Sequence, residues 1–400
     1  MSNQIPVVIA GAGITGLSAA LHLAELGAGS ILVASGPDEP TSAKAPGMIT
    51  GGQRDNFTRV AIAHQTDFAR VLWEFGDRAF DRTVTWARSH GVNVVTGHRL
   101  RLIVAPEELK EATEAVRLLT AAGLYGRLIQ GNELKGSSWA SCLGSRVMAI
   151  QDDGERGGWI DAGMMHQRML AAAKSHSSIS FTEAPVDEVD GYTEENIVVN
   201  IGGKKRSAAA LIVACHLATG NLVPSLKAAL VSSADQWLTA TGPLDPTNRS
   251  GDWNNAGIAW SAFHNHEWGA TLPDGRLLLG GGRILRKWAG FEAKEAEAEE
   301  RISKYIVDQA VKTFGRWKRP AASALEATAG LDCHPCDELP IVGPMFGEGR
   351  ILVAAGFMGQ GITLGFESGY CLAKLLMTGN CPELPRRLWP ERLRSLPDQE

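Results

Sequence analysis

Short apolar runs alternate along the chain with longer segments in which apolar residues recur at helical spacing. Residues 7–10 read Val-Val-Ile-Ala, residues 17–26 carry apolar side chains three and four positions apart, and residues 31–34 form a second apolar run. Strands are also predicted at 92–104, 178–189, 196–201, 209–214 and 350–355, and helices at 61–90, 106–122, 162–175, 291–314 and 362–377. This order predicts an α/β fold with a largely parallel sheet.

A glycine-rich stretch separates the first predicted strand from the first helix. Gly11 permits the tight turn, Gly13 lets a pyrophosphate approach the backbone, and Gly16 lets the helix pack on the strand. Ile14 and Thr15 then stand in the first helical turn, whose unpaired N–H groups bind phosphate. With a strand on each side, G-x-G-x-x-G predicts a dinucleotide-binding βαβ unit.

The second strand lacks the acidic residue that normally ends it and binds the adenosine ribose. Ala34 and Ser35 occupy that place. Ser35, or Asp38 or Glu39 in the following loop, would then supply the ribose contact. The alternative is that nucleotide binding is weakened or lost.

Composition restricts the class of protein. A chain of 400 residues, 44% of them hydrophobic, suggests one large domain or two interleaved domains. A net charge of −5 gives no electrostatic case for nucleic acid, and the 6 cysteines without a repeating pattern favour reduced thiols. We see neither a secretory signal nor a membrane-spanning run, so we expect a cytoplasmic protein that binds no membrane.

A second glycine turn follows the predicted strand at 350–355 and reads Gly-Phe-Met-Gly-Gln-Gly over 356–361. Together with the N-terminal motif, the Thr41–Ile49 loop, Gly-Trp-Ile-Asp at 158–161 and Leu-Pro-Ile-Val-Gly-Pro at 339–344, this ordered set resembles the amine oxidoreductase family that includes D-amino-acid oxidase, glycine oxidase and sarcosine oxidase. The resemblance covers most of the chain. It implies an α/β protein with a Rossmann-like FAD-binding domain and a mixed, largely antiparallel substrate domain.

The resemblance also implies which residues enclose FAD. Thr41 and Ser42 would lie near the phosphates, Gly47 and Met48 beside the isoalloxazine ring, and Val186 at the adenine. The strand that ends at Ala214 and the turn residues Gly356 and Gly359 belong to the same cofactor set.

The helix after this turn has a physical role of its own. A helix N-terminus carries a partial positive charge. The N–H groups of Gly361, Ile362 and Thr363, pointed at the flavin, would stabilise negative charge on its reduced form.

Two positions depart from the family pattern. Asp332 follows Ala-Gly-Leu where glycine oxidase has an arginine for the substrate carboxylate, so a cationic substrate is favoured unless Asp332 faces solvent. Gly330 stands where sarcosine oxidase has the cysteine that bonds to flavin, so we expect non-covalent FAD. Arg283 is our candidate for the missing carboxylate partner.

Two further clusters carry chemistry. Alternation would put His264 and His266 on one face of a strand, where one of them could tune amine protonation. Cys333 and Cys336 form a C-x-x-C pair, which suggests a redox centre as a minor alternative. Too few ligands accompany it for a metal site, and we predict none.

The sequence therefore predicts an FAD-binding domain from residues 1–90, 150–225 and 325–380, a substrate domain from 91–149 and 226–324, and a tail at 381–400. The expected reaction is oxidation of the C–N bond of a small amine to an imine, with O₂ or another electron acceptor. The candidate catalytic residues are Asp332, Arg283 and His264. The alternatives are a 2-hydroxy-acid or alcohol oxidoreductase on the same fold and a flavin-free binding protein. The oligomeric state does not follow from the sequence.

Overall fold

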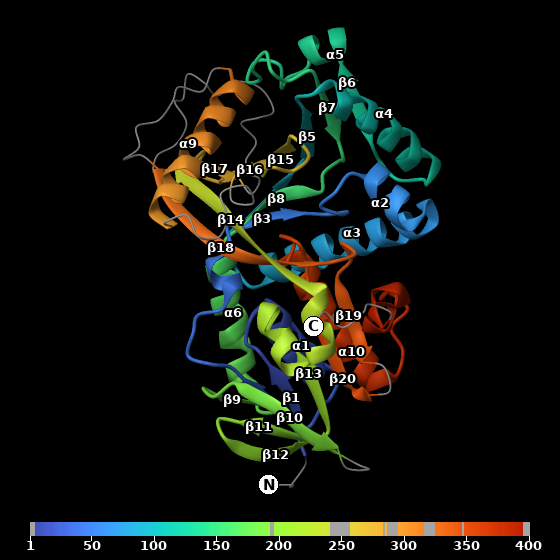
Figure 1. The fold of residues 1–400 in the computed structure, drawn as a ribbon, viewed down its shortest axis with the longest axis vertical. Coiled ribbons are helices and arrows are strands. Elements are labelled where there is room, and N and C mark those ends of the chain that lie inside the picture. The colour runs from blue at the N-terminus through green and yellow to red at the C-terminus, as the bar shows by residue number, and fades with distance from the viewer. Residues whose placement is uncertain are drawn as a thin grey trace.

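The computed structural model describes residues 5–192, 196–240, 257–282, 285, 295–315, 325–345 and 348–394. Figure 1 shows an elongated molecule with a sheet near the N-terminus at one end and a larger, twisted sheet towards the other. Arg283 and residues 395–400 lie outside the described residues.

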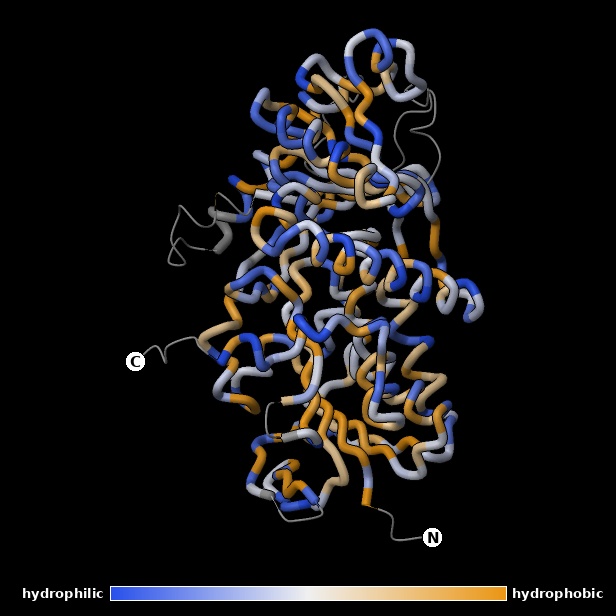
Figure 2. The backbone as a smooth tube through the Cα atoms, turned by 90° about the vertical axis from the view of Figure 1, so that its right-hand side faces the viewer, coloured by the Kyte–Doolittle hydropathy of each residue, from blue (hydrophilic) through white to orange (hydrophobic). Residues whose placement is uncertain are grey.

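A six-stranded sheet forms the N-terminal end, in the order β19-β20-β13-β1-β2-β9. Strands β1 (Val7–Ala10), β2 (Ile31–Ala34), β9 (Ile179–Thr182), β13 (Ala210–Val213) and β20 (Glu348–Ala355) run parallel, and β19 (Ile341–Met345) pairs antiparallel with β20. Their apolar residues are buried on both faces, as the continuous apolar runs predict. Figure 2 shows these strands as a hydrophobic layer inside more hydrophilic loops and helices.

Helices and a small sheet cover the two faces. Helices α1 (Ile14–Glu25), α3 (Thr66–Ser89), α6 (Ala162–Ser175) and α10 (Thr363–Thr378) share one hydrophobic core with one face of the sheet. The other face packs against the meander β10 (Val186–Tyr192), β11 (Ile197–Ile201) and β12 (Lys204–Ala208), and the short α7 (Thr219–Leu222) adds to that core. This arrangement is the doubly covered parallel sheet that the βαβ pattern predicts.

The eight-stranded sheet has the order β18-β14-β17-β16-β15-β5-β7-β6 and is antiparallel except for the β5–β15 pair. Its strands are β18 (Leu325–Pro335), β14 (Leu230–Ala240), β17 (Leu277–Gly281), β16 (Glu267–Thr271), β15 (Ala259–Ala262), β5 (Arg99–Ile103), β7 (Ala149–Asp152) and β6 (Arg127–Gln130). Helix α9 (Glu295–Thr313) packs on this sheet with Ile302, Ile306 and Ala310. Helices α4 (Pro106–Ala121) and α5 (Gly131–Gly136) lie at its β6 end (Figure 1).

A three-stranded sheet connects the two regions. It consists of β3 (Met48–Thr50), β8 (Gly157–Ile160) and β4 (Val94–Gly97), with β8 in the centre. The helix predicted over 61–90 is two helices, α2 (Phe57–His64) and α3, because Gln65 between them has φ of 71°. Left-handed backbone at a non-glycine residue ends helical hydrogen bonding.

Most of the other predicted elements end within four residues of their expected bounds, and α10 ends at Gly379 in the left-handed conformation. The strand predicted over 178–189 is two strands, β9 and β10, and residues 291–294 of the helix predicted over 291–314 lie outside the described residues. Strand β18 pairs with β14 along its whole length, although the sequence groups residues 325–335 with the FAD-binding segments. The division into two domains stays a prediction. In the described part of the chain, no helix is long and apolar enough to span a membrane.

Helices α1 and α10 cross in close backbone contact, and this contact requires glycine at position 369. A Cβ at Gly369 would lie 2.5 Å from the Thr15 carbonyl oxygen and 2.7 Å from the Ala19 nitrogen. We expect Gly369→Ala to lower the free energy of unfolding by about 1–3 kcal/mol, since two helix backbones would have to separate. Gly136→Ala, in open space on α5, is the matched control and should not destabilise the protein in urea unfolding. Equal effects would contradict the close crossing.

Candidate active site

The turn between β1 and α1 is shaped to receive a phosphate. Gly11 has φ of +109°, and a Cβ there would lie 2.4 Å from the carbonyl oxygen of Ala214. Gly13 is the N-cap of α1 and offers no side-chain hydrogen bond, and the first turn holds no acidic residue. Ser42 Oγ accepts a hydrogen bond from the Ile14 N–H at 3.3 Å. A polar hydroxyl and a positive helix end therefore meet at one point.

His166 fixes the geometry of this turn from α6. Its Nε2 lies 2.9 Å from the carbonyl oxygen of Ala12, and a carbonyl only accepts, so Nε2 carries the hydrogen. Sequence analysis missed His166, because a histidine within a helical pattern carries no signal of a contact made 154 positions away.

The residues at and after the end of β2 differ in how far they are buried. Ala34 is 1% exposed and packs in the same apolar cluster as Val186, so its side chain offers no hydrogen bond. Asp38 and Glu39 are exposed, and Glu39 forms an ion pair with Lys44 at 3.4 Å. A ribose contact from Ser35, Asp38 or Glu39 stays a prediction.

The second glycine turn packs against the end of β18. Gly356 and Gly359 have φ of +74° and +84°, and a Cβ on Gly356 would lie 2.3 Å from the Pro335 ring. Met358 donates its N–H to the Cys333 carbonyl at 3.2 Å. Glycine is required in this turn because β18 lies so close to it. Gly361 and Ile362 then lead into α10, where the Thr363 hydroxyl donates to the Gln360 carbonyl at 3.3 Å.

Gln360 connects this turn to β3. Its Nε2 donates to Thr50 Oγ1 at 3.0 Å, while its Oε1 is buried and has no partner among the described residues. Met48 and Gly47 lie in and just before the same β3, and a Cβ on Gly47 would lie 2.2 Å from the Ile160 carbonyl oxygen. The loop from Thr41, which forms a short 3-10 helix to Lys44, thus ends beside the second glycine turn.

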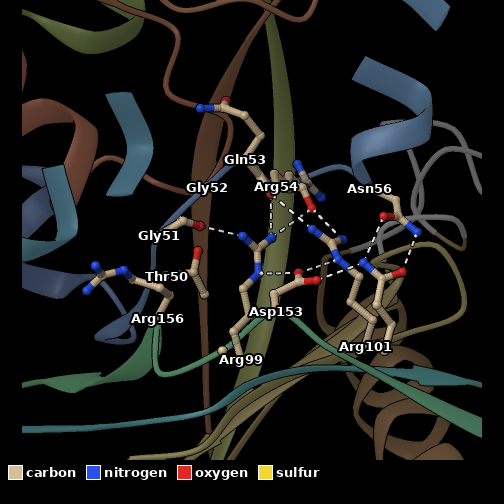
Figure 3. Close-up of polar contacts among 12 residues, drawn as sticks. Thr50, Gly51, Gly52, Gln53, Arg54, Asn56, Arg99, Arg101, Asp153 and Arg156 are labelled. Carbon is tan, nitrogen blue, oxygen red and sulfur yellow. Dashed lines mark hydrogen bonds and ion pairs between the residues drawn. The ribbon is translucent and has the colours of Figure 1, made fainter. Parts of the chain in front are cut away.

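Two buried arginines on β5 hold the loop that follows β3 (Figure 3). The Arg99 guanidinium donates to the carbonyls of Gly51 and Gln53, and that of Arg101 donates to the carbonyls of Gln53, Arg54 and Asp55. Arg101 Nε also donates to Asp153 Oδ2 at 2.8 Å. Burial, followed by the neighbouring Arg101 charge, lowers the pKa of Arg99 to about 9. These donors fix the backbone from Gly51 to Asp55 and with it the origin of the Arg54 side chain.

Arg54, His334 and Asp332 meet beside the second glycine turn. Arg54 Nη1 lies 3.3 Å from His334 Nε2, and the same Nε2 lies 3.0 Å from Asp332 Oδ2. A Cβ on Gly359 would lie 3.5 Å from Asp332 Oδ2, so Asp332 faces the turn and not solvent. Burial acts to raise the pKa of Asp332, but the hydrogen bond and charge of His334, followed by Arg54, hold it below its ordinary value. Asp332 is thus an anion in the site.

The face of the large sheet beside this site is aromatic. Trp237 and Trp268 form a buried cluster with Leu278 and neighbouring residues, and Met48 and Trp159 pack against it. The tryptophan rings lie over strand glycines, since a Cβ on Gly280 would lie 2.1 Å from the Trp268 ring. Met48, predicted beside the isoalloxazine ring, therefore faces an apolar wall.

The prediction for His264 and His266 is wrong in its geometry. Phe263, His264 and Asn265 have φ of 48°, 50° and 62°, so they form the turn between β15 and β16 and not a strand face. His264 Nδ1 lies 2.6 Å from Arg59 Nη2, and its backbone N–H donates to Glu108 Oε1 at 2.8 Å. Asn265 Nδ2 donates to the Arg54 carbonyl at 3.0 Å, so this turn supports the Arg54 loop. Consecutive left-handed residues leave no sequence pattern that distinguishes them from a strand end.

The surroundings of the C-x-x-C pair oppose a reactive dithiol. Cys333 is buried and Cys336 is exposed, and both are free thiols. Burial, followed by the Asp332 charge, raises the pKa of Cys333 to about 12, which opposes the thiolate that redox exchange requires.

The model of the FAD dependent oxidoreductase family matches residues 6–375. The chain belongs to this family. Its cofactor is FAD, and the enzyme is an oxidoreductase. The residues fit this cofactor, since the N-terminus of α1, with no acidic residue in its first turn, suits a pyrophosphate, and the unpartnered Gln360 Oε1 adds an acceptor at the second glycine turn. Which residues contact FAD stays a prediction.

Several solved structures share the fold of this FAD dependent oxidoreductase. Glycine oxidase from Geobacillus kaustophilus has a TM-score of 0.72 at 14% identity, with 96% of each chain covered. L-proline dehydrogenase from P. horikoshii has a TM-score of 0.72 at 16% identity, with 98% of each chain covered. L-amino acid deaminase from Proteus vulgaris has a TM-score of 0.70 at 16% identity, covering 97% of this chain and 94% of that one. A comparison with curated protein sequences gives no match.

FAD release tests the expectation of a non-covalent cofactor. A Cβ on Gly330 would lie 3.0 Å from the Trp237 ring, so the position of the linking cysteine is filled by a neighbouring aromatic side chain. We expect acid precipitation to leave the flavin absorbance in the supernatant. Flavin in the washed protein pellet would contradict this placement.

Asp77 makes stability depend on pH. Its Oδ1 accepts the Gly52 N–H at 2.9 Å, and burial, opposed mainly by Arg156, raises its pKa to about 6. Neutral Asp77 is favoured by folding, so this contribution is complete below pH ~4, the unfolded value, and is lost as pH rises through ~6. Asp77→Asn keeps an acceptor without the charge. We expect it to raise the free energy of unfolding by about 1–2 kcal/mol at pH 7.5 and not at pH 4.

The measurement is urea unfolding at both pH values, with Asp81→Asn as the control. Asp81 is the exposed partner of Arg156 at 2.6 Å, so its removal should change stability by less than about 1 kcal/mol. A loss of stability in Asp77→Asn at pH 7.5 would show that the carboxylate is ionised and paired.

Proposed function

We propose that this FAD-dependent enzyme oxidises the C–N bond of an amine or amino-acid-like molecule to an imine, which water then hydrolyses. FAD supplies a hydride acceptor for the carbon next to nitrogen. The observation that carries the proposal is the Asp332 carboxylate, buried against Gly359 in the second glycine turn. An anion at this place attracts a cationic amine and orients it towards the cofactor turn.

The sign of the Asp332 charge limits the substrate. A carboxylate group placed 4 Å from it would be repelled by about 4 kcal/mol at an effective dielectric near 20. One neutral hydrogen bond stabilises binding by only about 1 kcal/mol, which does not offset this repulsion. Arg54 contacts the same His334 nitrogen as Asp332, so an acid group is tolerated if it reaches Arg54 and the amine stays at Asp332.

The rest of the substrate would meet the aromatic wall. Trp237 and Trp268, with Met48 and Trp159 packed on them, offer an apolar surface, and aromatic rings also attract cations over their faces. The substrate that suits both features is an amine with an apolar or bulky substituent. The solved structures of similar fold are named for glycine, L-proline and L-amino acids, all of which are amines with an acid group.

Arg54 also supports a second candidate, oxidation of a 2-hydroxy acid. Its guanidinium would bind the carboxylate, and the His334–Asp332 pair would face the hydroxyl. The amine proposal is preferred because Asp332 gives a cation an advantage that a neutral hydroxyl does not receive. O₂ or another acceptor for the electrons, and a cytoplasmic location, remain our expectations.

An anaerobic screen for flavin bleaching tests this function. Matched pairs are pyrrolidine with L-proline and methylamine with glycine, and L-lactate represents the hydroxy acids. We expect amines to bleach the flavin and L-lactate not to do so. Bleaching by L-lactate alone would establish the second candidate instead.

Asp332→Asn tests the role of the charge. Removing the anion should improve the carboxylated member of each pair relative to the plain amine by about tenfold or more in kcat/KM, since a tenfold change corresponds to about 1.4 kcal/mol. Asn has nearly the same shape as Asp, so the substitution removes the charge without changing the packing, and no separate packing control is needed. An unchanged ratio would place Asp332 outside substrate contact.

A further inference from the structure

One ring nitrogen of His334 faces a cation and an anion at once. Nε2 lies 3.3 Å from Arg54 Nη1 and 3.0 Å from Asp332 Oδ2. A guanidinium N–H can only donate, and a carboxylate can only accept. Nε2 carries either a lone pair or a hydrogen, so only one of these contacts is a hydrogen bond at any moment.

The protonation state of Nε2 therefore selects its partner. Without a proton, Nε2 accepts from Arg54, and Asp332 Oδ2 faces a lone pair. With a proton, Nε2 donates to Asp332, and Arg54 loses its acceptor on this ring. Asp332 Oδ2 is buried and has no hydrogen-bond partner of regular geometry in the described ranges. This is expected of an oxygen that accepts a hydrogen bond only when His334 Nε2 is protonated.

Among the described residues, the groups that face His334 come from several elements. Asp332 comes from the same strand, and Arg54 from the loop before α2. On the loop after β13, burial lowers the pKa of His216 against the opposing charge of Asp332, so His216 adds no fixed cation. On β14, the residue paired with His334 is Val231. The second glycine turn contributes Met358 and Gly359, which are uncharged.

We propose that Nε2 of His334 accepts the proton that a protonated amine must lose before its C–N bond is oxidised. This role rests on the proposed function, because an ammonium nitrogen has no lone pair with which to form a C=N bond. The ammonium N–H bond breaks, its electron pair stays on the amine nitrogen, and a new N–H bond forms at Nε2. No electrons are exchanged in this step.

The two neighbours then act in opposite directions. Asp332 stabilises the protonated ring through a charge-assisted hydrogen bond. Arg54 stabilises the unprotonated ring, and once released it can bind an anionic group of the substrate. Proton uptake at His334 would thus prepare the site for a carboxylated amine.

NMR of the FAD-loaded enzyme with labelled histidine tests this without turnover. The His334 ring signal, assigned by its loss in His334→Gln, is followed over about pH 5–9. We expect the midpoint of its titration to move to lower pH in Asp332→Asn and to higher pH in Arg54→Gln, each by about 1 unit or more. Arg70→Gln removes an exposed charge on α3 and should leave the midpoint unchanged. Midpoints that stay fixed, or move in the same direction, would overturn the proposal.

A kinetic arm separates this proposal from the proposed function. The rate of flavin reduction by pyrrolidine or L-proline should rise with pH along a limb that moves in the same two directions, and His334→Gln should lose that limb. If either amine reduces the flavin but the pH–rate limb stays in place in both Asp332→Asn and Arg54→Gln, the role of His334 is overturned and the proposed function is not. Opposite NMR shifts without reduction by either amine would overturn amine oxidation, and with it the amine as proton source.

Discussion

The burial of Arg99 and Arg101 on β5 is the constraint on which the geometry of the site depends. Two guanidinium groups share one buried carboxylate, Asp153, so their remaining N–H groups need other acceptors. The carbonyls of the loop from Gly51 to Asp55 supply them (Figure 3). Each loss of such a donor would leave buried carbonyls unsatisfied, at about 1–3 kcal/mol each. The loop is therefore held to the sheet that carries the arginines.

This restraint holds the loop after β3 against the eight-stranded sheet at the place where chemistry is proposed. Arg54 leaves the restrained loop towards His334 on β18, and Asn265 holds the Arg54 carbonyl from the β15–β16 turn. The second glycine turn approaches β18 from the other side, through Met358 and Cys333. A cation and an anion are thus both held at one nitrogen of an imidazole. Such an arrangement suits proton transfer and discrimination between charged substrates better than nucleophilic catalysis, because no activated hydroxyl or thiolate belongs to it.

Several glycines of the large sheet lie under or beside tryptophan rings. Trp268 lies over Gly280, Trp260 over Gly269 and Trp237 beside Gly330. A side chain at any of these glycines would lift the ring from the strand. Rings that lie on bare backbone form an apolar surface. Trp237 and Trp268 do so beside Met48, whereas Trp260 packs in the separate core cluster that α9 covers.

The sequence by itself determined the parts of this protein that depend on local spacing. The βαβ unit, the second glycine turn, the apolar face of α9 and the left-handed end of α10 at Gly379 follow from periodicity and glycine placement, because neighbouring residues alone set these patterns. The position of Asp332 could also be anticipated by resemblance, but its exposure could not. Only the tertiary structure placed Arg54 and His334, 280 positions apart, beside one another. It also put His264 in a turn and His166 on the phosphate loop. Contacts between distant segments depend on how whole sheets pack, and no pattern within either segment records the partner.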